Sequence, residues 1–244
     1  MITPTQDKIR LRGVIRQVYK KAGRAINDYS MIQDKDRILV GVSGGKDSLS
    51  LLKILLMRRA HIPIDFELIA CFVDVNFGPR NRDLLEEYFK REGLRYAIKE
   101  LTLEEEDINC FWCSWNKRKI LFTTAREYNC NKIALAHHLD DIIETILMNL
   151  FFHGEISSMR PKIELFGGDL TIIRPFAYLE KVQLERFHSK LGLADTQHSC
   201  PYALDTKRAF IKETIRQLQK EFPHIKKNIF RSLQRRKIRE DYLP

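Results

Sequence analysis

The segment Ser43–Ser48, with the sequence SGGKDS, combines residue types that bind phosphate groups. It follows an apolar, β-branched run at Arg37–Val42 and precedes a leucine-rich segment predicted to be helical from Asp47 to Arg59. Glycines let the backbone approach an anion closely, and the start of a helix presents N–H groups and the positive end of its dipole. The six predicted phosphate-binding residues are Ser43, Gly44, Gly45, Lys46, Asp47 and Ser48. Asp47 would repel a bare phosphate, so it is expected to bind Mg²⁺ or to cap the helix; a simple glycine turn is the alternative for the whole segment.

Cys110 and Cys113 form a C-x-x-C pair, and Cys200 lies far downstream. Thiolates at this spacing can hold a metal ion or two corners of an iron–sulfur cluster; a redox dithiol or two unligated thiols are the alternatives. Cys71 and Cys130 lie in or next to apolar runs and are predicted to pack in the core. Three aromatic side chains flank the pair and are expected to give it a dry, apolar surround: Phe111, Trp112 and Trp115.

A third group of polar residues follows the apolar run Lys132–Ala136: His137, Asp140 and Asp141. Ligands of open parallel sheets bind at the carboxyl ends of the strands, so these side chains are expected to face the SGGKDS segment. Asp140 and Asp141 are predicted Mg²⁺ ligands, with ordinary helix capping as the alternative. His138 is expected to be structural.

Apolar runs alternate with helical segments up to about residue 153, which predicts an α/β fold with a doubly wound, mostly parallel sheet. Residues 162–165 and 170–174 flank Gly167-Gly168-Asp169 and predict a hairpin. Helices are expected at 7–28, 47–59, 81–92, 114–128, 140–152, 180–191, 206–220 and 223–239. The predicted domains are a basic N-terminal helix (1–30), a catalytic domain (31–175) and a C-terminal helical region with a basic helix (176–244).

Charge is concentrated at the two ends of the 244-residue chain, which has a formal net charge of +10. Residues 8–24 hold seven Lys or Arg and no acid, and residues 205–239 hold twelve bases and three acids. This pattern predicts contact with a polyanion such as nucleic acid; solvated helices are the alternative. The composition excludes disordered, collagenous and coiled-coil chains. We see no secretory signal and no apolar run that could span a bilayer, so a cytoplasmic location is expected.

The motif SGGKDS after an apolar strand resembles the PP-loop of the N-type ATP pyrophosphatases, which have a Rossmann-like fold and cleave ATP between its α- and β-phosphates. Over roughly residues 10–240 the chain resembles one group of these enzymes, the tRNA 2-thiocytidine synthetase family. The motifs that carry this resemblance are Tyr29-Ser30-Met31-Ile32, SGGKDS, C-x-x-C followed by Lys117-Arg118, the segment 136–141 (AHHLDD), Ile173-Arg174-Pro175 and Cys200.

The resemblance implies an ATP-dependent tRNA sulfurtransferase that adenylates C2 of a tRNA cytidine, of the anticodon-loop position 32 type, and replaces the oxygen with sulfur. It implies a [4Fe–4S] cluster on Cys110, Cys113 and Cys200, with one iron left open for sulfide. The implied catalytic residues are Asp47, Lys117 and Asp141, and Mg²⁺ is assigned to Asp47, Asp140 and Asp141. Beyond the SGGKDS segment, the implied ATP-binding residues are Asp74, His137 and Arg174. The implied partners are tRNA, a cysteine desulfurase or other sulfide donor, and a second copy in a homodimer, with no membrane.

Three positions depart from the family pattern: Ala136 and Leu139 in AHHLDD, and Ala203, where the family usually has a further cysteine. The chain also lacks the paired zinc-finger cysteines of the related 2-thiouridine-type thiolases, which favours the 2-thiocytidine branch. The alternatives are a PP-loop enzyme of another specificity (a 2-thiouridine-type thiolase or a lysidine synthetase-like enzyme), a sulfur enzyme acting on a small molecule, and a non-catalytic nucleotide- and RNA-binding module.

Overall fold

The computed structural model describes residues 11–75, 80–101, 110–193 and 206–234. The chain divides into two compact units. The first comprises Met1–His138 and Arg160–Ala203, and the second comprises Leu139–Met159 and Leu204–Pro244.

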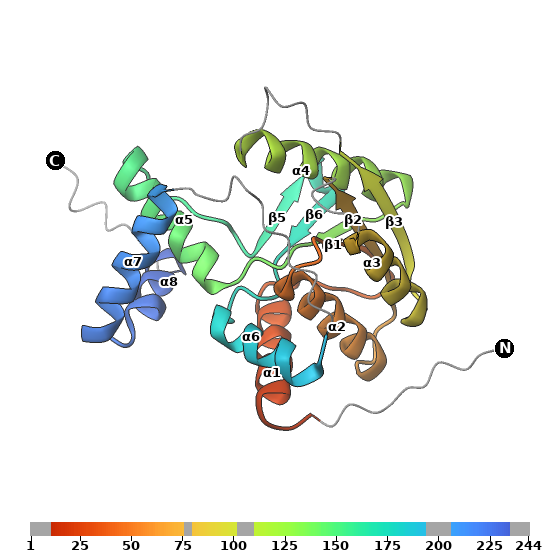
Figure 1. The fold of residues 1–244 in the computed structure, drawn as a ribbon, viewed down its shortest axis with the longest axis horizontal. Coiled ribbons are helices and arrows are strands. Elements are labelled where there is room, and N and C mark those ends of the chain that lie inside the picture. The colour runs from red at the N-terminus through yellow and green to blue at the C-terminus, as the bar shows by residue number, and fades with distance from the viewer. Residues whose placement is uncertain (1–10, 76–79, 102–109, 194–205, 235–244) are drawn as a thin grey trace. The chain divides into compact units, whose positions relative to one another are not determined.

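The first unit contains the sheet and five of the helices (Figure 1). Its strands are β1 (Asp36–Val42), β2 (Phe66–Asp74), β3 (Arg95–Glu100), β4 (Lys132–Ala134), β5 (Lys162–Leu165) and β6 (Leu170–Ile173). Its helices are α1 (Gly13–Asp28), α2 (Lys46–His61), α3 (Arg80–Arg91), α4 (Cys110–Glu127) and α6 (Lys181–Leu191), and a short 3₁₀ turn, η2 (Phe166–Gly168), joins β5 to β6.

The sheet has the strand order β3-β2-β1-β4-β6-β5, and every pair is parallel except β5–β6. Val40 of the central strand β1 pairs with Ala70 of β2 on one side and with Ala134 of β4 on the other. β1 is apolar from Ile38 to Val42, as expected for a strand covered on both faces. The predicted hairpin is confirmed and adds an antiparallel edge strand, and its turn needs glycine because Gly168 has a φ of +106°.

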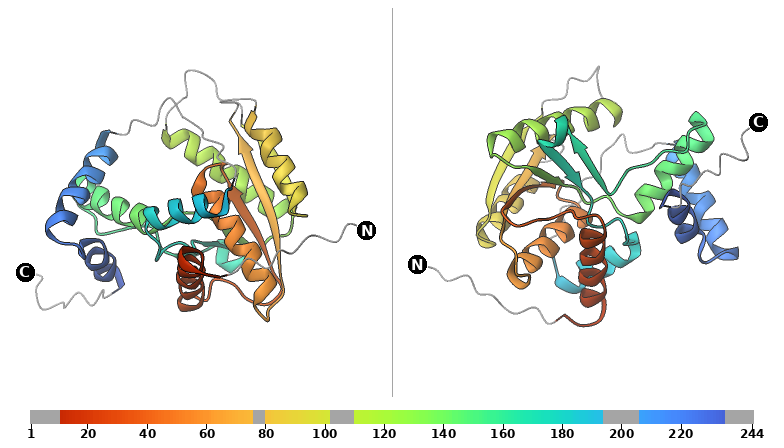
Figure 2. Two further views of the ribbon diagram at one scale, coloured as in Figure 1. Left: turned by 60° about the horizontal axis from the view of Figure 1, so that its bottom comes forward. Right: turned by 180° about the vertical axis from the view of Figure 1, so that it is seen from behind.

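Helices cover both faces of the sheet (Figure 1, Figure 2). One face carries the larger apolar core, to which α1, α2, α3 and α6 contribute; its fully buried members include Val18, Leu52, Phe89 and Phe187. The other face is packed by α4 through Leu121, Phe122 and Ala125. The predicted doubly wound α/β fold is therefore confirmed.

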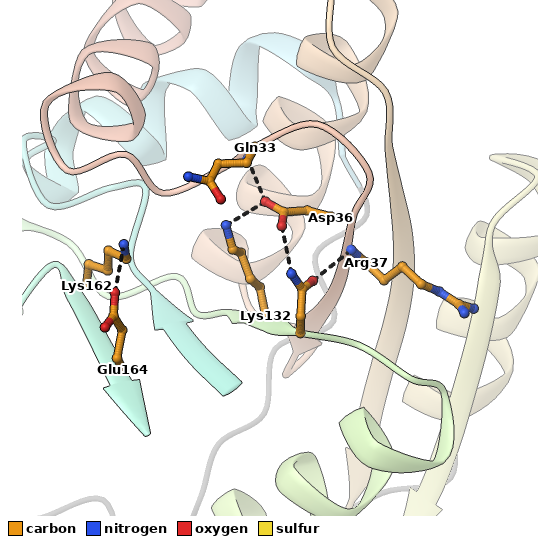
Figure 3. Close-up of polar contacts among 7 residues, drawn as sticks. Gln33, Asp36, Arg37, Lys132, Lys162 and Glu164 are labelled. Carbon is orange, nitrogen blue, oxygen red and sulfur yellow. Dashed lines mark hydrogen bonds and ion pairs between the residues drawn. The ribbon is translucent and has the colours of Figure 1, made fainter. Parts of the chain in front are cut away.

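A buried polar cluster ties β1 to β4 at their amino ends (Figure 3). The Asp36 carboxylate lies 2.6 Å from Lys132 Nζ and accepts hydrogen bonds from Asn131 Nδ2 (2.8 Å) and from the Gln33 backbone N–H (2.6 Å). Asn131 Oδ1 in turn accepts from the Arg37 N–H. Only 3% of Asp36 and 5% of Lys132 is exposed. A buried ion pair requires further hydrogen bonds, and those from Asn131 and Gln33 to Asp36 meet this requirement.

The second unit consists of α5 (Leu139–His153), α7 (Thr206–Glu221) and α8 (Ile225–Gln234). Its small apolar core includes Ile142, Ile146, Ile211 and Phe230. Glu144 on α5 is buried, with Arg208 Nε of α7 at 3.8 Å from its carboxylate, and burial raises the pKa of this carboxyl.

The predicted elements are recovered with shifts of a few residues at their ends. Residues 7–10 and 235–239 of the two predicted basic helices lie outside the described residues. The units divide the chain differently from the three predicted domains, because α5 groups with α7 and α8, whereas α6 groups with the sheet. Among the residues that the structure describes, no helix has the length and apolarity to cross a membrane.

Candidate functional site

The SGGKDS segment forms a tight loop between β1 and α2, and Ser48 holds it in shape. The buried Ser48 hydroxyl accepts a hydrogen bond from the Ser43 N–H (3.1 Å) and donates one to the Gly45 carbonyl (2.9 Å). Gly44 has a φ of +83°, in the left-handed region that favours glycine. The hydroxyl predicted to bind phosphate at position 48 thus braces the loop from inside, whereas Ser43 is exposed.

The loop leads directly into the amino end of α2. This helix begins at Lys46, and its first internal hydrogen bond runs from the Leu49 N–H to the Gly45 carbonyl (3.2 Å). The N–H groups ahead of Leu49 lie at the positive end of the helix dipole, an arrangement that binds anions. Lys46 adds a formal positive charge at the first position of the helix. This geometry is suited to binding a phosphate group.

His138 contacts the loop through Asp47. Asp47 Oδ2, in the first turn of α2, lies 3.8 Å from Nε2 of His138, which is 4% exposed. His138 was expected to be structural, and its contact with Asp47 was not predicted. The position of His138 beside the loop could have been predicted from strand pairing. β4 pairs with β1, so both histidines that follow β4 lie beside the loop that follows β1.

His137 contacts a different residue, Arg174, which follows β6. Arg174 Nε donates to His137 Nδ1 (3.2 Å), and Arg174 Nη1 donates to the Arg160 carbonyl. Arg174 is buried, and its pKa is lowered to about 10, first by burial and then by the positive charge of Arg118. The two predicted site residues His137 and Arg174 are therefore brought together.

Asp74 is the last residue of β2, next to β1 in the sheet, and is 5% exposed. Because β2, β1, β4 and β6 are parallel, their carboxyl ends share one edge. Asp74, the SGGKDS loop, His137 and Arg174 all lie at this edge.

Cys110 is the first residue of α4, and Cys113 and Lys117, four positions apart, lie on one side of the helix. Cys113 is a free, half-buried thiol, and Lys117 is also half-buried. The Cys110 side chain and Cys200 lie outside the described residues, and among the described ones no three His, Cys, Asp or Glu side chains are grouped to hold a metal ion. A half-buried thiol in the first turn of a helix, with a second cysteine three positions earlier, fits a soft-metal or cluster site.

Cys71 and Cys130 behave differently from Cys113. Both are buried in the core beneath α4, as predicted, and burial raises the pKa of each thiol to about 11.

The expectation for Trp115 was wrong: its side chain is 58% exposed and provides no dry surround for Cys113. Trp115 follows Cys113 by two positions, which rotates it by about 200° to the other side of the helix.

Asp140 and Asp141 belong to the second unit, in the first turn of α5. Asp140 Oδ1 lies 2.7 Å from Lys226 Nζ of α8, and both side chains are largely buried. This ion pair was not predicted, because it depends on the packing of α8 against α5. A cation at Asp140 would compete with Lys226 for the carboxylate.

Comparison with known proteins gives a consistent result. Residues 15–219 match the model of the PP-loop domain family. The chain is 35% identical to the tRNA-cytidine(32) 2-sulfurtransferase of Pelobacter propionicus over 95% of its own length and 90% of that protein. It is also 35% identical to the protein of the same name from Geobacter sulfurreducens, over 93% and 91% of the two chains.

Among solved structures, the U34-tRNA thiolase NcsA from Methanococcus maripaludis, determined with its [4Fe-4S] cluster, matches with a TM-score of 0.76. The match is 23% identical in sequence and covers 91% of this chain and 79% of the thiolase. The fold of the described residues is thus the fold of that protein.

Proposed function

The chain belongs to the PP-loop domain family, together with the tRNA-cytidine(32) 2-sulfurtransferases, and from this membership we propose that it is an ATP-dependent tRNA sulfurtransferase. Its product is 2-thiocytidine at position 32 of tRNA. The observation that carries the proposal is 35% identity over 95% of the chain. The loop at the amino end of α2 supports it independently, because this geometry is suited to the phosphates of ATP.

The first chemical step is adenylation. O2 of the cytidine attacks the α-phosphorus of ATP, the new O–P bond forms, and the bond between the α-phosphorus and the bridging oxygen breaks to release pyrophosphate. The loop N–H groups and Lys46 bind the departing pyrophosphate, and Asp74 and His137 bind the rest of ATP. Stabilisation of the charge that develops on the leaving group lowers the barrier.

The second step replaces oxygen with sulfur. Hydrosulfide attacks C2, the C2–O bond breaks, and AMP leaves with the former cytidine oxygen while the sulfur loses its proton. Lys117 is the residue proposed to bind the departing phosphate, and Asp141 is the residue proposed to orient the cytosine. A [4Fe–4S] cluster, held by Cys110, Cys113 and Cys200, supplies when bound an iron with an open position for sulfide.

Asp47 is the proposed Mg²⁺ ligand of the first unit, since it lies in the loop where the ATP phosphates bind. Asp140 and Asp141 are the proposed carboxylates of the second unit, and binding of Mg²⁺ there requires Asp140 to exchange its ion pair with Lys226 for the metal. Mg²⁺ would neutralise phosphate charge and thereby assist pyrophosphate release.

tRNA is the proposed macromolecular partner, and α1 supports it. Four exposed bases follow one another at four-residue intervals: Arg12 at the N-cap of this helix, and Arg16, Lys20 and Arg24 within it. The opposite side of the helix is buried. This stripe is suited to phosphate contacts that position tRNA without reading its sequence. The proposal further includes a cysteine desulfurase or another sulfide donor, a homodimer and a cytoplasmic location.

The test follows pyrophosphate release from ATP in the presence of two tRNA transcripts that differ only in cytidine or uridine at position 32. Release stimulated by the cytidine transcript alone is expected. Equal stimulation by both transcripts would contradict the specificity, and no stimulation by either would contradict the enzyme assignment.

A further inference from the structure

The outer side of α4 carries an exposed aromatic residue beside two exposed bases. Trp115 is 58% exposed, and Arg118 and Lys119 are exposed as well. Their spacing of three and four residues places all three side chains on one face of the helix. We name Trp115, Arg118 and Lys119 the α4 ridge.

The α4 ridge is electrostatically positive along its whole length. From Cys110 to Arg126 the helix sequence contains no acidic residue, and Glu127 at its end lies 2.6 Å from Lys99. The inner side of α4 is accounted for by packing, because Leu121 and the fully buried Ala125 belong to the core under the sheet. The ridge is therefore the side of α4 left for another molecule.

Arg118 connects the ridge to the candidate site. Its positive charge lowers the pKa of Arg174, which donates to His137 at the carboxyl edge of the sheet. Cys113 and Lys117 lie within the same turns of α4 as the ridge, on another side of the helix. A polymer that brings one nucleotide to the site can thus pass along the ridge with its neighbouring nucleotides.

An exposed indole flanked by cations is suited to binding single-stranded RNA. Unpaired bases stack on aromatic side chains whatever their sequence, and Arg or Lys beside the aromatic ring neutralise the flanking phosphates. Position 32 opens the anticodon loop, so the nucleotides that follow it are not paired in the stem. Two adjacent cations with no acidic residue on the same face match the phosphates of RNA better than they match a protein partner.

We infer that the α4 ridge binds the tRNA loop next to the target nucleotide, with Trp115 stacked on an unpaired base and Arg118 and Lys119 at its phosphates. The inference rests on the proposed function for the identity of the RNA. It names Trp115 as a positioning residue, which acts through the bound RNA and not on the reacting atoms.

The chain has only two tryptophans, Trp112 and Trp115, which makes a direct test available. In the full-length Trp112→Phe variant, Trp115 is the sole tryptophan, and stacking on a base is expected to quench its fluorescence on titration with tRNA. An RNA hairpin with an unpaired loop should quench as tRNA does, and a fully paired RNA duplex of the same length should not. Fluorescence that does not change at saturating tRNA would overturn the inference.

Binding of labelled tRNA by substituted proteins gives the second measurement. Trp115→Ala should weaken binding about tenfold or more, Trp115→Phe should retain most of it, and Arg118→Gln/Lys119→Gln should reduce the salt dependence of binding. The matched control is Phe166→Ala, since Phe166 is 66% exposed but precedes β6, at the end of the sheet opposite the site.

The two proposals fail in different ways. If the Trp115→Ala variant binds tRNA as tightly as the wild-type protein does, the role of the α4 ridge is overturned and the proposed function still stands. Wild-type protein that binds no tRNA would contradict the proposed function, and the inference with it. Quenching by a sulfur-donor protein with none by tRNA would identify the ridge as a protein interface and also overturn the inference.

Discussion

Arg174 Nε lies 3.2 Å from Nδ1 of His137, so the arginine after β6 donates a hydrogen bond to the first histidine after β4. With Nδ1 as the acceptor, the proton of the neutral imidazole is carried by Nε2. Arg174 is itself fixed by the Arg160 carbonyl, which its Nη1 contacts, and by the bond from its backbone N–H to the Pro161 carbonyl (2.8 Å). His137 therefore presents a defined donor nitrogen at the carboxyl edge of the sheet.

This relationship predicts that substitutions at Arg174 and His137 are coupled. Arg174→Lys removes the Nε donor, and loss of a hydrogen bond from a charged group costs about 1.5–3 kcal/mol, so tRNA-dependent pyrophosphate release should fall roughly tenfold or more. In a His137→Gln background the same substitution should have a much smaller effect. Arg160→Lys is the control, because Arg160 contacts Arg174 only through its backbone carbonyl. Additive effects of the two substitutions would show that the residues act independently.

The internal brace of the phosphate loop leads to a second prediction. Ser48→Ala removes both the acceptor for the Ser43 N–H and the donor to the Gly45 carbonyl, so binding of a non-hydrolysable ATP analogue should weaken by about 1–2 kcal/mol. Ser50→Ala is the matched control in the same helix, because the Ser50 hydroxyl is buried without a hydrogen-bond partner. Calorimetric titration distinguishes them, and equal affinities of the two variants would contradict the bracing role.

The buried ion pair at the other end of the sheet should affect stability but not chemistry. Lys132→Met leaves the Asp36 carboxylate buried without its counter-charge, which costs about 3–5 kcal/mol of unfolding free energy. Lys162→Met is the control, since the Lys162–Glu164 pair is partly exposed and such pairs contribute about 0–1 kcal/mol (Figure 3). Urea denaturation measures both. A Lys132→Met protein as stable as the control would contradict the assignment.

The free energy of unfolding is expected to depend on pH through the buried carboxyl of Glu144. Burial raises the pKa of its carboxyl above the ordinary value of 4.5, so the folded state holds this proton to a higher pH than the unfolded state. The stability that it contributes is complete below pH 4.5 and is lost as the pH rises through the folded-state pKa. Glu144→Gln should therefore stabilise the protein at neutral pH and have little effect in acid.

Glu213 provides the opposite case for the same denaturation series. Hydrogen bonds from Arg216 and Gln217 lower the pKa of this exposed carboxyl to about 2, so its contribution is present above pH 4.5 and is lost in acid. Glu213→Gln should destabilise the folded protein at neutral pH.

A Glu144→Gln variant that is less stable than wild type at neutral pH would contradict the prediction for Glu144. It would show that the ion pair with Arg208 outweighs the cost of burial.

The parts of the site that were predictable from sequence are those formed by neighbours in the chain. The SGGKDS loop was located correctly because the apolar strand, the glycines and the start of the helix are adjacent residues. Placement of His137 and Asp74 at the same edge followed from the parallel order of the strands. Local pattern and sheet topology were sufficient for these residues.

Contacts between distant segments were not predictable. Arg174 meets His137 only because β6 returns beside β4, and Asp140 meets Lys226 only because α8 packs against α5. The prediction for Trp115 was wrong because residues two positions apart on a helix point to different sides, so closeness to Cys113 in sequence does not bring the Trp115 side chain close to that thiol. The Asp47–His138 contact was missed for a similar reason: His138 was judged from its position next to His137 and not from the partner strand β1.

The central claim, ATP-dependent thiolation of cytidine 32, is tested most directly by nucleoside analysis of the tRNA product. Anaerobically prepared protein is incubated with unmodified tRNA, ATP, Mg²⁺ and sulfide, and the tRNA is digested and examined by mass spectrometry. The account predicts 2-thiocytidine at position 32, formed only with ATP and abolished by Lys46→Ala and by Cys113→Ser. Release of AMP and pyrophosphate with no sulfur in the tRNA, or thiolation that survives Cys113→Ser, would contradict it.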